Sequence, residues 1–117
     1  TEGNEFMTLA ITPTSATTRL KIDVVLFGAS NSTNWTTMAL FQDSTADALA
    51  AVSYLPSANW TDCLSFSHTM TSGTTSETTF KVRASGTSGT FTFNGSGGTR
   101  KYGGVAASSI TITEYNA

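Results

Sequence analysis

Hydrophobic and polar residues alternate along several segments of the chain, a pattern typical of β-strands with one buried face. The alternation is clearest in residues 18–27, where Leu20, Ile22 and Val24 are separated by charged side chains, and in residues 62–70. Shorter alternating runs surround Phe80 and Val82, Phe91 and Phe93, and Ile110 and Ile112, and weaker candidates are residues 5–11 and 34–41. The pattern predicts about eight short antiparallel strands.

Residues 43–52 fit two descriptions. The Ala-rich run is compatible with a short helix capped by Asp43 or Ser44. It is equally compatible with a loop over residues 42–47 followed by a strand over residues 48–53. We favour the hairpin, because both flanking segments are predicted strands, although residues 46–51 alone do not distinguish helix from strand.

Clusters of Gly, Pro, Ser and Asn separate the predicted strands, as turns do in β-proteins. They cover residues 12–17, 28–34, 55–59, 71–76, 84–89 and 94–106. The last segment contains two Gly pairs, which allow unusual backbone angles, and we expect it to wrap a sheet edge or to reach a neighbouring chain. Strands and turns at this spacing predict one all-β domain over residues 1–117, an antiparallel β-sandwich of jelly-roll type.

The composition narrows the classes of function. Thr and Ser, with 23 and 15 residues, make up about a third of the chain, whereas charged residues make up only 12%. Six Lys and Arg against eight Asp and Glu leave a net charge of −2, which excludes nucleic-acid binding by bulk electrostatics. No apolar run approaches the roughly 20 residues that span a bilayer.

The single cysteine, Cys63, provides neither a disulfide framework nor a Cys-based metal cluster. A domain of this size then depends on its core, on partner chains, or on both. The chain starts without Met or a signal-like stretch, so we expect it to be a fragment or a processed product.

The sequence offers few residues that could catalyse a reaction. His68 is the only histidine and occupies the apolar face of its predicted strand, where we expect a core or interface role. The carboxylates are scattered singly, so we expect no catalytic residues, no cofactor and no metal site. One alternative stays open, a calcium ion held by Asp43 and Asp47 in their shared loop.

Aromatic residues near loops are the better functional candidates. Trp35 and Trp60 each lie in an Asn-Trp-Thr triplet at a loop edge, and Tyr102 lies with Arg100 in the Gly-rich segment. Exposed Trp and Tyr side chains stack on sugars and anchor interfaces. We therefore name Trp35, Trp60, Tyr102 and Arg100 as candidate receptor-binding residues, against the alternative that both Trp side chains plug the ends of the sandwich.

Four segments together resemble a module of bacteriophage virion proteins: TEGNEFMTLAITPTSATTRLKIDV, ALFQDSTADALAA, MTSGTTSETTFKVR and FNGSGGTRKYGGVAASSITITEY. This module recurs at the C-terminal end of tail-fibre-like and other phage structural proteins. The resemblance covers nearly the whole chain in order and is weakest at residues 28–33 and 52–60, which would be variable loops. It implies a jelly-roll sandwich like that of tumour necrosis factor, commonly a homotrimer at the tip of a fibre or spike. It transfers no catalytic and no receptor-binding residue.

The resemblance and the residue pattern together lead to one expectation. The chain is expected to be the trimeric C-terminal head of a phage tail fibre or spike, located on the virion and binding a polysaccharide or outer-membrane protein of the host surface. Its other partners would be virion proteins, with no nucleic acid. The alternatives are a capsid decoration or cement protein, a carbohydrate-binding module attached to a hydrolase and, least favoured, an enzyme.

Overall fold

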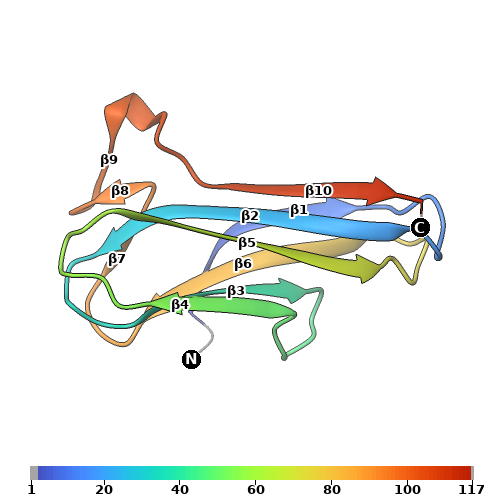
Figure 1. Cartoon of the computed structure of the whole chain (residues 1–117), viewed down its shortest axis with the longest axis horizontal. Helices are drawn as coiled ribbons and strands as arrows, with labels where there is room; N and C mark the ends of the chain where they lie inside the picture. The colour runs from blue at the N-terminus through green and yellow to red at the C-terminus, as the bar shows by residue number, and fades with distance from the viewer. Residues whose placement is uncertain (1–2, 117) are drawn as a thin grey trace.

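Two antiparallel sheets face each other in the computed structural model, which describes residues 3–116 (Figure 1). Sheet A has the strand order β1 (Asn4–Ile11), β6 (Thr78–Gly86), β3 (Thr36–Gln42) and β4 (Ala50–Tyr54). Sheet B has the order β10 (Ser109–Tyr115), β2 (Arg19–Ser30) and β5 (Asp62–Thr71), and β7 (Phe91–Phe93) pairs with the end of β2 beyond β10. A small hairpin of β8 (Gly95–Ser96) and β9 (Thr99–Arg100) precedes the short 3-10 turn η1 (Tyr102–Gly104).

The strand pairs are nested along the sequence. The hairpin β3–β4 lies in sheet A, the pair β2–β5 that encloses it in sequence lies in sheet B, and the next pair, β1–β6, lies again in sheet A. Every pairing is antiparallel. The chain therefore winds as one long folded ribbon around a common interior.

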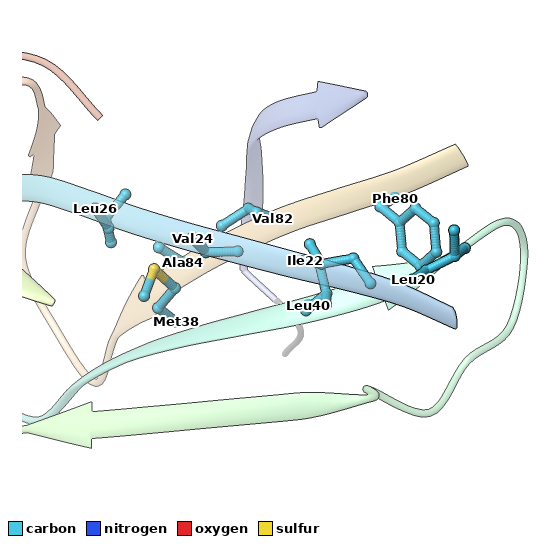
Figure 2. Packing of buried hydrophobic residues seen from close by; sticks show 9 residues of the cluster. All are labelled: Leu20, Ile22, Val24, Leu26, Met38, Leu40, Phe80, Val82 and Ala84. Carbon is cyan, nitrogen blue, oxygen red and sulfur yellow. The ribbon is translucent and has the colours of Figure 1, made fainter. Parts of the chain in front are cut away.

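The core forms where the central strands of the two sheets meet (Figure 2). Its fully buried members come from β2, β3 and β6: Leu20, Ile22, Val24, Leu26, Met38, Leu40, Phe80, Val82 and Ala84. All occupy alternate positions of their strands, which confirms the predicted alternation on β2 and at Phe80 and Val82. Burying each large side chain stabilises the fold by about 1.5–3 kcal/mol.

The sides of the sandwich are less well covered than its centre. On β5, the inward residues Leu64, Phe66, His68 and Met70 are only half-buried, as is Val52 on the neighbouring edge strand β4. Neither strand contains Lys, Arg or Pro, the residues that usually protect exposed strand edges from pairing. The β4/β5 side therefore presents apolar side chains beside two unprotected edges.

The structure decides the ambiguous segment in favour of the hairpin. Residues 50–54 form β4 and pair with β3, so the helical alternative is wrong, and the connecting loop begins at Asp43 with a positive φ of 51°. Strand β4 begins two residues later than the predicted strand, residues 48–53, and ends one residue later. Three further predictions need correction. Strand β6 continues to Gly86 and places Ala84 in the core, so the turn predicted over residues 84–89 begins later. Strand β2 continues to Ser30 because β7 pairs with its end, and the Gly-rich segment, predicted as one long loop, contains β8, β9 and η1.

Candidate binding site

Three loops meet at one end of the sandwich, where β2 and β4 end and β3 and β5 begin; we call this the loop end (residues 31–35, 55–61 and 87–90). Backbone hydrogen bonds join them. The Asn59 N–H donates to the Ser30 carbonyl at 2.8 Å and the Asn31 N–H to the Thr90 carbonyl at 3.0 Å. The Ala58 N–H donates to the Thr33 hydroxyl at 3.1 Å. Loops that are far apart in sequence thus form one surface.

Asn34 holds two of these loops together. Its side chain is 5% exposed, and Nδ2 lies 2.7 Å from the Ser88 carbonyl, 3.0 Å from the Ser32 carbonyl and 3.1 Å from the Ser30 hydroxyl. A Cβ at Gly86 would collide with the Asn34 Oδ1, so only glycine fits beside this amide. The Asn34 side chain therefore fixes the backbone immediately before Trp35.

Trp35 is presented by this fixed backbone. Its carbonyl accepts a hydrogen bond from the Thr87 N–H at 3.0 Å, and its side chain is 54% exposed. Trp60, in the loop of residues 55–61, is 67% exposed. With more than half of each indole exposed, neither Trp is a buried plug of the sandwich, and that alternative is wrong.

Tyr102 and Arg100 lie apart from the two Trp residues, on the projection formed by β8, β9 and η1 (Figure 1). Tyr102 has a positive φ of 49° and is 86% exposed. Asn94 secures the base of the projection, because its Oδ1 accepts from the Ser108 N–H at 2.7 Å. A hydrogen bond of 3.2 Å from the Ser96 hydroxyl to the Asn59 carbonyl links the projection to the loop end.

The outward face of sheet A carries a second surface that the sequence analysis missed. Phe41 follows the inward Leu40 on β3 and therefore points outward, yet it is only 7% exposed and lies outside the core cluster. Arg83, which also points outward, from β6, lies with its guanidinium carbon 5.8 Å from the centre of the Phe41 ring. An Nη1–H of Arg83 donates to the Gly3 carbonyl at 3.2 Å. The guanidinium is thus held between an aromatic ring and the backbone.

Arg83 borders three hollows. The smallest, of about 230 Å³, is lined by Asp43 and Lys81, among others, and we call the two larger ones together the Arg83 groove. One, of about 550 Å³, is lined by Trp35, Thr37, Phe41, Arg83, Ser85 and Thr87, among others. The other, of about 670 Å³, lies towards β1 and β7 and is lined by residues that include Arg83, Phe6 and Phe91. A hydrophobic residue at an outward position of β3 was the only sequence signal for this surface, because the strand register that places Phe41 near Arg83 is not visible in the sequence.

Two titratable groups outside the groove, Asp43 and Tyr54, interact with neighbouring parts of the fold. The Asp43 carboxylate accepts hydrogen bonds from the Thr78 hydroxyl and the Thr79 N–H, both at 2.9 Å, which ties the loop after β3 to β6. Burial and, to a smaller extent, the charge of Asp62 raise the pKa of Tyr54. Within residues 3–116, no three His, Cys, Asp or Glu side chains gather in a way that could hold a metal ion.

No helix in the described part of the chain has the length and apolar character needed to cross a membrane. Comparison with known proteins adds no assignment, since no protein-family model matches the chain and no curated protein is significantly similar to it.

Proposed function

We propose that the chain is a host-attachment domain of a bacteriophage virion, the C-terminal head of a tail fibre or spike that binds a receptor on the host surface. The observation that carries the proposal is the exposure of two Trp side chains on the joined loops at one end of the sandwich. Trp35 and Trp60 come from separate loops that are hydrogen-bonded into one surface, and Tyr102 stands on the adjoining projection. Large rigid side chains with one polar group are typical anchors of binding surfaces.

The proposal includes a homotrimer of jelly-roll domains. The nested pairs β3–β4, β2–β5 and β1–β6 support the jelly roll, because a jelly roll is a long antiparallel ribbon wound alternately through two sheets. The β4/β5 side supports self-association, since its half-buried Val52, Phe66 and Met70 and its unprotected edges would be covered by a sister copy. Three copies would turn weak contacts with the host into stable attachment.

A carbohydrate-binding module is the second candidate, and the Arg83 groove is the observation that favours it. A groove with Trp35 at one end and with hydroxyl groups along it suits a saccharide whether or not the domain belongs to a virion. This candidate predicts a monomer with measurable sugar affinity.

Two measurements test the proposed function. Size-exclusion chromatography with light scattering should give the mass of three chains, and a monomer would overturn the trimer. In a competition assay, the purified domain should block adsorption of the phage that carries it, whereas the Trp35→Ala and Trp60→Ala variants should block it less while remaining folded by circular dichroism. Failure of the unmodified domain to compete would overturn the attachment role and would favour a decoration protein of the capsid.

A further inference from the structure

We infer that the Arg83 groove binds an anionic saccharide, with a sugar ring against Trp35 and the anionic group of the sugar on Arg83. This inference deepens the proposed function, on which it rests for its biological setting, by naming the class of receptor and the residues that distinguish it from a neutral glycan.

Arg83 has the geometry of a preformed anion site. Its guanidinium is already oriented by the Phe41 ring and by the Gly3 carbonyl, so little side-chain freedom remains to be lost on binding. A guanidinium matches a carboxylate or a phosphate with two parallel hydrogen bonds, and these charge-assisted bonds are about twice as strong as neutral ones.

No carboxylate within residues 3–116 forms an ion pair with Arg83. The only ion pair within residues 3–116 joins Lys21 and Asp23 on sheet B, at 3.8 Å. Glu5 is the register partner of Arg83 on β1, but the two side chains form no ion pair. Lys81, the register partner of Phe41, adds a second positive charge on the same face. Glu5 and Asp43, which borders a small hollow with Lys81 and Arg83, match these two positive charges in number, so the preference for an anion depends on the orientation of the Arg83 guanidinium.

The remaining groove residues suit a sugar rather than an isolated anion. Trp35 borders the same hollow as Arg83 and offers an exposed indole face on a backbone fixed by Asn34 and Thr87. Thr37, Ser85 and Thr87 line the same hollow. The Thr37 hydroxyl is hydrogen-bonded to the Ser53 hydroxyl at 2.7 Å and the Ser85 hydroxyl donates to the Gly86 carbonyl at 3.0 Å, but both oxygens can still accept a hydrogen bond from a saccharide hydroxyl. Each hollow of the Arg83 groove lies in the range of about 300–1,000 Å³ that is usual for ligand sites.

The test is a calorimetric titration of the full chain with three probes: tetragalacturonic acid, its methyl ester, and galactose 6-phosphate. The acid should bind at least about tenfold more tightly than the ester, since a charged hydrogen bond contributes that much or more. Galactose 6-phosphate identifies the anion: binding tighter than that of the acid assigns a phosphate receptor, and weaker binding assigns a carboxylate. Equal affinity for the acid and the ester, or no binding of either anionic probe, would overturn the inference.

Arg83→Gln should lose at least about tenfold in affinity for the anionic probe and keep the affinity for the ester. Arg19→Gln is the matched control, because Arg19 is an outward arginine on a central strand of the opposite sheet, where it donates to the Thr71 hydroxyl at 3.1 Å. Trp35→Ala should weaken the binding of both the acid and the ester, and Trp35→Phe should lose less affinity for both than Trp35→Ala does. An Arg83→Gln variant that binds like the Arg19→Gln control, with both folded by circular dichroism, would refute the role of Arg83.

Failure of this inference is distinguishable from failure of the proposed function. If Arg83→Gln blocks phage adsorption as well as the unmodified domain does and Trp60→Ala does not, the attachment role stands and the groove is not its receptor site. If the unmodified domain binds the acidic sugar but does not compete for adsorption, the groove stands and the attachment role falls.

Discussion

Replacing Asn34 with Ala removes the side chain that joins the loop of residues 31–35 to the loop of residues 87–90. The two N–H bonds of Nδ2 are shared among the Ser30 hydroxyl and the carbonyls of Ser32 and Ser88, at 2.7–3.1 Å. The Oδ1 accepts from the Thr87 N–H at 3.2 Å, a weaker contact, since this N–H also donates to the Trp35 carbonyl. The substitution therefore removes two full hydrogen bonds and one shared bond.

A net contribution of about 1 kcal/mol for each hydrogen bond gives an expected loss of about 2–3 kcal/mol in the free energy of unfolding. The loss is measured by urea denaturation, where the midpoint should fall while the slope with urea stays unchanged. Asn31→Ala is the matched control, because Asn31 is exposed and its Oδ1 accepts mainly from the Thr90 N–H at 2.8 Å. We expect a loss of about 1 kcal/mol or less for this control.

Asn34→Asp sharpens the test. It keeps the shape of the side chain but turns a carboxylate oxygen towards the carbonyls of Ser32 and Ser88, so it should be more destabilising than Asn34→Ala at neutral pH. Acidification should restore part of the stability, because the protonated carboxyl can donate again. A loss for Asn34→Ala no larger than that for Asn31→Ala would refute the reasoning.

Two further predictions concern ionisable groups. The Glu114 Oε2 accepts from the Thr18 hydroxyl at 2.6 Å and from the Thr14 N–H at 2.8 Å, and these bonds lower the pKa of Glu114. Because the pKa is lowered in the folded state, the stabilisation is present above the unfolded pKa and is lost as the pH falls through the folded value. The urea midpoint of Glu114→Gln should therefore lie below that of the unmodified chain at neutral pH and approach it in acid; a constant difference would contradict this. The Asp62→Asn substitution should lower the raised pKa of Tyr54 only in part, because burial is the larger cause of the shift. NMR titration of the Tyr54 ring measures this pKa, and an unchanged value would exclude the influence of Asp62.

The sequence is sufficient for the elements whose one face is buried along their whole length. On β2, alternation from Leu20 to Leu26 predicted the strand because each inward side chain enters the core. The end of β2 was missed because pairing of Ser30 with Phe91 extends it, and a partner 61 positions further along the chain leaves no local signal. The hairpin β8–β9 was missed for a related reason, since strands of two residues have no periodicity.

Of the two candidate binding surfaces, the sequence predicted the loop end in part but not the Arg83 groove. The Asn-Trp-Thr triplets and the turn residues around them identified Trp35 and Trp60 as loop residues, and the structure exposes both. The Arg83 groove was not predicted, because alternation along one strand does not show which residues of neighbouring strands share a face. Only the register between β3 and β6, which pairs Phe41 with Lys81 and Ala39 with Arg83, brings these side chains to the same outward face.

The central position of β2 in sheet B has a consequence for the order of folding. One edge of β2 pairs with β5, and the other pairs with β10. The pairing partners of Arg19 to Val25 on this second edge are Ser109 to Tyr115, at almost the opposite end of the described chain. During synthesis on the ribosome, the segment that contributes Leu20, Ile22 and Val24 thus emerges long before its last partner. The sandwich can therefore close on this side of β2 only after Ser109 to Tyr115 have been synthesised, and until then the longest strand of the chain has one unpaired edge.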